Sequence, residues 1–175
     1  MLREQIFRKM KTWNTVFIVF GIIGLAFSVF GLVSGAILIP DYFSINMIET
    51  VISLVMLVVT IYTVVVAIKN NKIIAEEKEV NVIPYILTLM MQAYSIVMGV
   101  VSIFNGSIEA NLSMNGLDNV STADTKMLLT IGMITAVVTL AISALVGILP
   151  SLRVLMLNGK AKKIEEVNDY NDEEE

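Results

Sequence analysis

The sequence contains no cysteine and no histidine. Disulfides and thiolate nucleophiles are therefore excluded, together with zinc or haem sites built on these side chains. The side chain that most often transfers protons near neutral pH is also missing. Because these absences remove most classes of enzyme, we expect a protein without catalytic residues, without a metal and without a cofactor.

Charged residues are scarce as well. They make up 16% of the 175 residues, whereas hydrophobic residues make up 56% and the mean hydropathy is +0.79. Soluble globular proteins contain about 25% charged and roughly 45–50% apolar residues. The charges gather at the two ends and in short interruptions between apolar runs. This composition indicates an integral membrane protein.

Four apolar runs are long enough to cross the hydrocarbon core of a bilayer, which takes about 20 helical residues. They cover residues 15–39, 47–68, 83–105 and 127–149. The first run follows a basic segment and exceeds the apolar core of a signal peptide, so we interpret it as a retained anchor. The prediction is an all-α membrane protein with four transmembrane helices within residues 15–149.

Basic residues lie almost entirely on one side of this predicted membrane. They precede the first span, separate the second from the third and follow the fourth, and only Lys126 falls on the other side. Since positively charged flanks stay in the cytoplasm, both termini should be cytoplasmic and residues 106–126 should form an external loop. We expect a multi-pass protein of a cell membrane, and favour the cytoplasmic membrane of a bacterium.

This external stretch also contains three N-x-S sequons, at Asn105, Asn111 and Asn119. In a eukaryote they would be glycan acceptors on the correct side of the membrane. In a bacterium they are a by-product of a loop rich in asparagine and serine, which is the interpretation we favour.

The segment before the first span, residues 1–14, is basic and amphipathic. Leu2, Ile6, Met10 and Trp13 recur at helical spacing. This pattern suits a helix that lies in the anionic inner interface before the chain turns into the bilayer. Ordinary topogenic charge with a tryptophan anchor explains the same residues, and this is the interpretation we favour.

The segment after the fourth span, residues 150–175, changes from basic to acidic beyond Gly159. We interpret it as a solvated, disordered cytoplasmic tail, in preference to a docking motif for a basic partner. The loop at residues 69–81 repeats this order of charges. Acidic patches on the loop and the tail are therefore a plausible contact surface.

Small residues recur along the first span at Gly21, Gly24, Ser28, Gly31 and Gly35. The alternating steps of three and four average 3.5 residues, the period of a left-handed supercoil. In lipid, burial of apolar surface cannot drive helices together, and close approach across small residues does much of the work. We therefore predict a packing face on this span.

Comparable lines occur on other spans. The third and fourth spans contribute Gly99, Ser102, Gly132, Ala136, Ser143 and Gly147. Together these lines predict a four-helix bundle with left-handed, near-parallel crossings. The stretch from Gly31 to Gly35 has an alternative interpretation as a lateral dimer interface of the GxxxG type.

Polar side chains accompany the small residues. The buried polar or pore-lining candidates are Thr60, Thr63, Gln92, Ser95 and Thr139. Gln92 is the most polar residue well inside a span, and its amide needs partners because an unsatisfied group in hydrocarbon is costly. We favour a hydrogen bond to a hydroxyl of the second or fourth span, Ser143 included, over a ligand contact.

No Asp, Glu, Lys or Arg lies in the interior of a predicted span. Ion-coupled transport, proton relays and voltage sensing generally need such groups and are disfavoured. We expect a non-enzymatic protein that acts through transmembrane helix association as an accessory, assembly or immunity-type subunit, in a homo-oligomer or a complex with another membrane protein. The alternative is an oligomeric channel or small-solute transporter lined by threonine, serine and glutamine. We expect the lipid bilayer, and no nucleic acid, among its partners.

Overall fold

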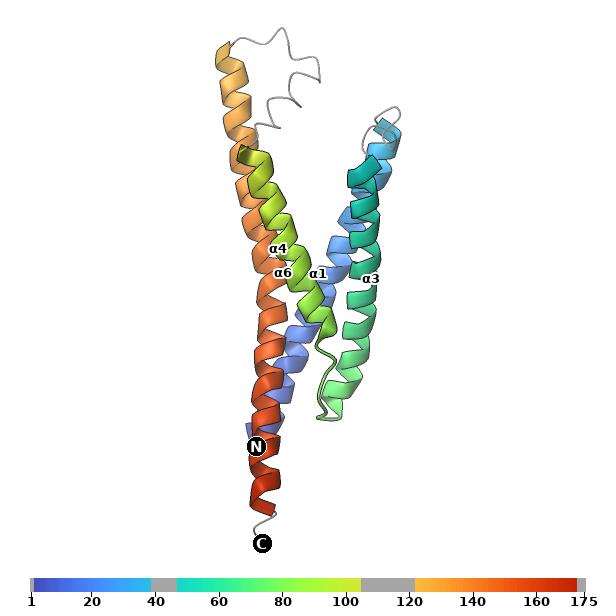
Figure 1. Ribbon diagram of the computed structural model, residues 1–175, viewed down its shortest axis with the longest axis vertical. Helices are drawn as coiled ribbons and strands as arrows, with labels where there is room; N and C mark the ends of the chain where they lie inside the picture. Colours follow the sequence, from blue (N-terminus) through green and yellow to red (C-terminus); the bar gives the residue numbers. More distant parts are fainter. Residues whose placement is uncertain (1, 39–46, 105–121, 173–175) are drawn as a thin grey trace. The chain divides into compact units, whose positions relative to one another are not determined.

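The computed structural model describes residues 2–38, 47–104 and 122–172 (Figure 1). Within them the regular structure is helical and consists of α1 (Leu2–Leu38), α3 (Met47–Ala75), α4 (Ile83–Phe104) and α6 (Thr122–Asp172). The segment around Pro40, the three sequons and the last acidic residues lie outside the described part. So do many side chains of α6 on either side of residues 145–165.

Three of these helices, α1, α3 and α4, are long and apolar enough to cross a membrane. Large apolar side chains remain exposed along them, such as Phe27, Val58 and Met90 at 71%, 65% and 64%. Water would penalise such surfaces, and lipid tails do not. The prediction of an all-helical chain is therefore confirmed for the described residues, and three of its helices are compatible with a membrane protein. Helix α6 includes the fourth predicted span, and the crossing angles and the side on which the termini lie stay predictions.

Helix α1 runs without a break from Leu2 to Leu38, so the structure does not support the alternative in which an interfacial helix turns into the first span. The apolar side chains of its first turns find protein partners. Phe7 and Met10 are buried in the core, and Trp13 packs against that core. Contact with other helices thus replaces the membrane interface as the surface that covers this stripe.

Helix α6 continues well past the fourth predicted span and ends at Asp172. The expectation of a disordered tail is therefore wrong up to that residue. Pro150 lies inside this helix, where it has no N–H to donate. Val154 and Ala161 beyond it are buried in the core, and this packing holds the helix after the proline in place.

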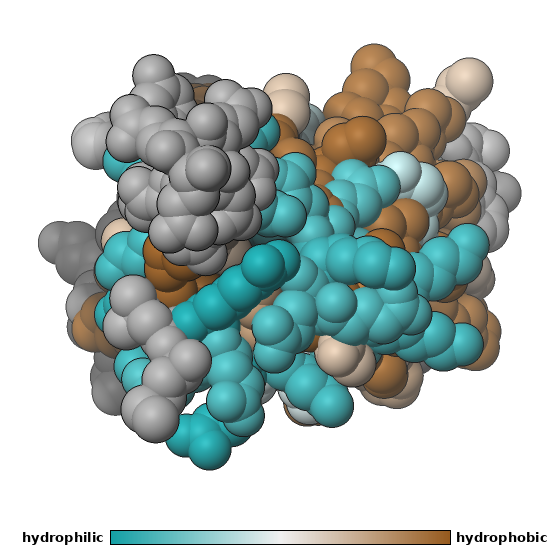
Figure 2. Space-filling model, turned by 90° about the horizontal axis from the view of Figure 1, so that it is seen from below, coloured by the Kyte–Doolittle hydropathy of each residue, from teal (hydrophilic) through white to brown (hydrophobic). Residues whose placement is uncertain are grey.

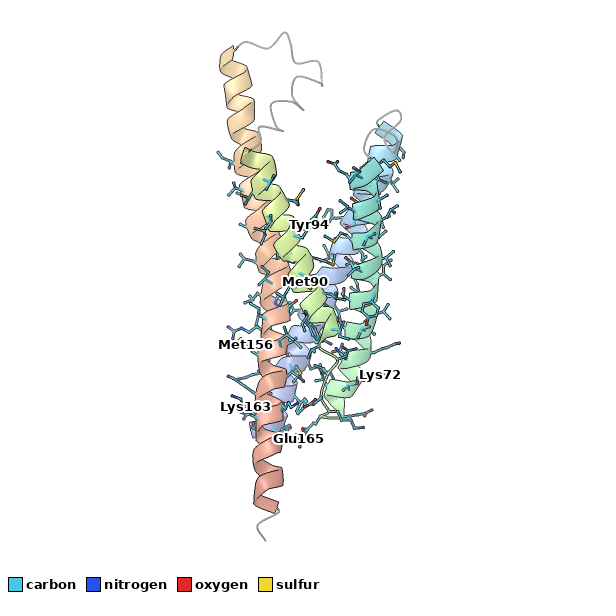
Figure 3. The ribbon with its side chains drawn as sticks, in the orientation of Figure 1. Lys72, Met90, Tyr94, Met156, Lys163 and Glu165 are labelled. Carbon is cyan, nitrogen blue, oxygen red and sulfur yellow. The ribbon has the colours of Figure 1, made fainter. Side chains whose placement is uncertain are left out.

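The chain divides into two compact units, residues 1–89 with 146–175 and residues 90–145. The first unit contains α1, α3, the start of α4 and the second part of α6. The second unit contains the rest of α4 and the first part of α6. On that part of α4, Met90 and Tyr94 are exposed and lie one turn apart (Figure 3).

Candidate functional site

The buried residues of the first unit concentrate where the basic residues lie. The hydrophobic core consists of Phe7, Met10, Phe17, Ile18, Val64, Ala67, Ile74, Val80, Tyr85, Val154 and Ala161. Seen from this side, the surface around the core is largely hydrophilic (Figure 2). We refer to residues 2–18, 63–85 and 150–165 as the basic end. Here α1, α3, α4 and α6 are held together.

At the centre of the basic end, Asn14 is completely buried and makes three hydrogen bonds. Its Nδ2 donates to the carbonyl oxygen of Ala67 and to Oδ1 of Asn71, each at 2.8 Å. Its Oδ1 accepts a hydrogen bond from the Tyr85 hydroxyl at 2.6 Å. Both donor hydrogens and the acceptor of this amide are therefore used, and α1 is joined to α3 and α4.

A second buried amide, Asn70, extends these bonds into the loop before α4. Its Nδ2 donates to the Tyr85 hydroxyl at 3.0 Å and to the Asn81 carbonyl at 2.8 Å, and its Oδ1 accepts the Asn81 N–H at 3.2 Å. Asn81 Oδ1 in turn accepts the N–H of Ile83 at 3.0 Å. That N–H belongs to the first turn of α4 and has no partner within the helix.

The Tyr85 ring adds an apolar contact to its two hydrogen bonds. It meets the Phe17 ring edge to face, with 5.0 Å between centroids and 67° between the planes. We call Asn14, Asn70, Asn71, Asn81 and Tyr85 the polar clamp. Because its buried amides and hydroxyl are satisfied by one another and by backbone groups, it specifies one arrangement of three helices.

Sequence reasoning missed the polar clamp. The asparagines stand at the edges of apolar runs, where polar residues are expected to face water or headgroups. Asn14 of α1 lies 53 residues before Ala67 and 71 residues before Tyr85, two of its hydrogen-bond partners. The available signal was weak. Asn70 and Asn71 follow a 22-residue apolar run on what proved to be the same helix.

The turn that ends α3 is held by backbone hydrogen bonds. Lys78 N–H donates to the Ile73 carbonyl and Glu77 N–H to the Ile74 carbonyl, each at 3.1 Å. This pair of bonds defines a Schellman motif, whose C′ residue is usually glycine. Here it is Glu77, with a φ of 54°. Arg3 Nη2 donates to its carbonyl at 3.0 Å and so ties α1 to the turn.

Glu77→Gly is expected to raise the free energy of unfolding by about 0.5–1 kcal/mol. Glycine adopts a positive φ without the steric cost that a Cβ brings, and the bond from Arg3 goes to a backbone carbonyl that the variant retains. The midpoint of SDS-induced unfolding in dodecyl maltoside micelles measures the change. Glu79→Gly is the control. An equal gain for both variants would show that the backbone angle is not its cause.

Ion pairs join α6 to the rest of the basic end. Glu165 lies 3.7 Å from Arg3, and Glu79 lies 3.9 Å from Lys162. Asn158 Oδ1 also accepts the buried N–H of Val80 at 3.2 Å. The acidic residues of the loop and of α6 that the structure describes are thus partly engaged with basic residues of the same chain.

Within the loop, Lys78 lies beside Glu76, with Nζ donating to Oε2 at 2.7 Å. This hydrogen bond, and the charge of the ammonium, hold the pKa of the Glu76 carboxyl below its usual value. The same contact raises the pKa of Lys78. Both side chains are exposed, so the pair contributes little to stability.

The predicted small-residue line of α1 has two different environments. A Cβ added at Gly21 would stand 2.5 Å from Cγ2 of Val64, so α3 passes close to α1 at this glycine. A Cβ added at Gly24 or Gly31 would meet no atom within 4 Å. Ser28, between them, is exposed, and its hydroxyl donates to the Gly24 carbonyl of its own helix. We call Gly24, Ser28 and Gly31 the open line.

The other predicted packing residues lie on helices as expected. Gly99 of α4 and Gly147 of α6 are partly buried, and the Gly147 carbonyl accepts a hydrogen bond from the Ser151 hydroxyl at 2.9 Å. The backbone is helical at Gly35, Ser102, Gly132, Ala136, Thr139 and Ser143, whose side-chain environments lie outside the described part.

The polar candidates are divided between the two units. Thr60 and Thr63 belong to the first unit, where their hydroxyls donate to the carbonyls of Met56 and Thr60 at 2.7 and 2.9 Å. Gln92, partly buried, and Ser95, exposed, belong to the second. Hydroxyls that bond to their own helix are satisfied in lipid without a second helix. The two threonines therefore have their donors occupied without Gln92.

No family model, curated protein or solved structure matches this chain. Among the described residues, no three acidic side chains come together in a way that could hold a metal ion. The features of this chain that bear on a function are therefore the polar clamp, the open line and the basic end.

Proposed function

We propose that this chain is a non-enzymatic multi-pass membrane protein that acts by associating with another transmembrane helix through α1. It serves as an accessory, assembly or immunity-type subunit, in the cytoplasmic membrane of a bacterium with both termini in the cytoplasm. The single observation that carries the proposal is the open line, where Gly24 and Gly31 have free space at the positions that a Cβ would fill.

An open line of small residues has a cost that packing within the first unit does not offset. Glycine in a helix is about 1 kcal/mol less favourable than alanine. At Gly21 the contact with Val64 supplies a reason for the missing Cβ. At Gly24 and Gly31 the first unit provides no such contact. A partner helix packed closely against α1 would provide one and would explain the missing side chains.

The polar clamp supports this division of roles along α1. It fixes α1 near Asn14, with Phe17 and Ile18 buried just beyond it. Further along, Phe27 and Phe30 are 71% and 70% exposed. The first part of α1 therefore holds the fold together, and its second part presents aromatic and small side chains to lipid or to a partner helix.

The channel alternative has less support. Its proposed lining includes Thr60 and Thr63, whose hydroxyls donate to carbonyls of α3. Thr63 is also 2% exposed and so lies inside packed protein. A wetted pore wall would present such hydroxyls to water or ions.

The variant Gly31→Leu is expected to reduce association at least tenfold. An added side chain would fill the free space on the open line and keep a second helix from close approach. The measurement is native mass spectrometry of the tagged protein, extracted gently from its own membrane, with the fraction in a complex read from the masses.

The matched control is Val33→Leu. Val33 is exposed on the same helix and lies about 180° around it from the centre of the open line, at 100° per residue. It should leave the complex unchanged. Equal complex formation by the wild type and both variants would contradict the proposed role of the open line.

A further inference from the structure

A groove lies at the basic end between the first turns of α1 and the last part of α6, both in the first unit. Its volume is about 360 Å³, within the range of roughly 300–1,000 Å³ typical of small-molecule sites. The lining residues are Gln5, Ile6, Lys9, Leu157, Lys160, Lys163 and Ile164. The groove therefore combines three ammonium groups with three aliphatic side chains, and no carboxylate lines it.

The walls of the groove are fixed by contacts on either side of it. Arg3 pairs with Glu165 beyond one end, and the Arg153 guanidinium lies 5.8 Å from the centre of the Trp13 ring beyond the other. Met10 of α1 is fully buried in the adjoining core. The separation of the two helices at the groove is thus set by the packing of the basic end.

The groove lysines, like Lys11, Lys69 and Lys72, form no ion pair among the described residues. In the described residues, the ion pairs engage Arg3, Lys78 and Lys162, each with a glutamate. Lys9, Lys160 and Lys163 take part in none of these pairs. Their charges therefore add to a local positive potential that an anion would neutralise.

The groove also lies next to the apolar surface that faces lipid. Met156 is 56% exposed and projects from the same side of α6 as Lys163 (Figure 3). Seven residues of helix separate them, roughly 10 Å along the axis. The exposed apolar surface of α6 thus gives way to ammonium groups over about two turns, the spacing expected where the hydrocarbon core meets the phosphate layer.

We propose that this groove binds the phosphodiester headgroup of an anionic phospholipid from the adjacent leaflet. The three ammonium groups would contact the phosphate, and Ile6, Leu157 and Ile164 would contact the glycerol and the first methylenes of the acyl chains. A free phosphate ion would gain nothing from these aliphatic walls. Among the acidic residues after Lys163, Glu165 is paired with Arg3, and α6 remains helical to Asp172.

This inference rests on the membrane placement of the chain and not on its partner helix. The test uses the full-length protein in nanodiscs of phosphatidylcholine with 20% phosphatidylglycerol, ejected into a native mass spectrometer. The wild type is expected to retain phosphatidylglycerol selectively. The triple variant Lys9→Gln, Lys160→Gln, Lys163→Gln is expected to lose at least 90% of that retained lipid, a tenfold decrease.

The control triple variant is Lys11→Gln, Lys69→Gln, Lys72→Gln, which removes the same charge from exposed positions outside the groove. It should retain the lipid. Replacing the three groove lysines by arginine keeps the charge and should also retain it, even where the glutamine variant folds poorly. Equal retention by both glutamine variants would overturn the proposal, and so would displacement of the lipid by 20 mM inorganic phosphate at constant ionic strength.

Loss of the partner complex in Gly31→Leu with lipid retention intact would contradict neither proposal, because Gly31 lies far along α1 from Lys9. Loss of selective lipid retention in the groove variant with the complex intact would support the lipid site alone. The two experiments can therefore fail independently.

Discussion

Asn14→Ala is expected to lower the free energy of unfolding by about 2–4 kcal/mol. The change removes three hydrogen bonds and leaves the Tyr85 hydroxyl without the acceptor that it now reaches at 2.6 Å. A buried polar group left without a partner costs about 1–3 kcal/mol. The shift in the midpoint of SDS-induced unfolding, followed by circular dichroism in dodecyl maltoside, gives the measurement.

The control for Asn14→Ala is Thr15→Ala at the next position. Thr15 is exposed, and its hydroxyl donates only to the Lys11 carbonyl of its own helix, at 2.9 Å in the structure. Its replacement should change the free energy of unfolding by less than about 0.5 kcal/mol. Equal effects at the two positions would show that Asn14 is not part of a buried network.

A double-mutant cycle with Tyr85→Phe separates the bond between these side chains from the rest of the clamp. Because Asn14 and Tyr85 share a hydrogen bond, the double variant should be less destabilised than the sum of the single variants, by about 0.5–3 kcal/mol. Tyr62→Phe, at a tyrosine that is 43% exposed on α3, is the control and should show no such coupling with Asn14→Ala.

Gly21→Ala is expected to lower the free energy of unfolding by about 1–3 kcal/mol, although alanine is the better helix former. The new methyl would stand 2.5 Å from Cγ2 of Val64, a core side chain that is 5% exposed. Adding a methyl to a packed contact costs more than helix propensity returns. The same unfolding assay gives the value.

Gly24→Ala is the matched control, because the same methyl would meet no atom within 4 Å there. It should leave stability unchanged or raise it by up to about 1 kcal/mol. Val64→Ala in the Gly21→Ala background should recover part of the loss by making room for the methyl. If Gly21 and Gly24 tolerated alanine equally, close contact between α1 and α3 at Gly21 would be wrong.

The long apolar helices could be predicted from the sequence because a bilayer would impose their length and composition. A span needs about 20 apolar residues, and every backbone polar group within it must be bonded internally. α3 begins at Met47 and α4 at Ile83, as predicted. Each of these starts follows polar or turn-forming residues that mark the edge of an apolar run.

The two ends of the chain were harder to predict, since the same pattern suits two surfaces. The stripe of Leu2, Ile6, Met10 and Trp13 has the amphipathicity of an interfacial helix, and it also suits a helix packed on protein. The tail had too few apolar residues to indicate a core contact, yet Val154 and Ala161 are buried at one side of α6. Only the presence of a neighbouring helix decides between these outcomes.

The candidate site was predicted in part. The small-residue line included Gly21, where a contact occurs, and Gly24 and Gly31, where the first unit provides none. The only sequence signal for the lysine groove was the excess of basic residues. Lys9 and Lys160 both line it, although they belong to helices that are far apart in the sequence. Local spacing reveals one face of one helix, and it does not reveal which other helix meets that face.

The polar clamp and the open line together suggest how the protein combines a fixed fold with an available surface. Satisfied amides at the basic end hold α1 in one position relative to α3 and α4. In the proposed complex, this would restrict α1 before a partner helix binds and so reduce the entropy that association must overcome. Variants that loosen the clamp should therefore weaken the complex as well as the fold.

The most direct test of association through α1 uses the absence of cysteine from the chain. A single cysteine introduced by Ser28→Cys on the open line, or by Val33→Cys on the opposite side of α1, is labelled with benzophenone maleimide in native membranes and irradiated. Our account predicts a discrete crosslinked protein product from position 28 and little from position 33. Equal products from both positions, or lipid adducts alone from position 28, would contradict it.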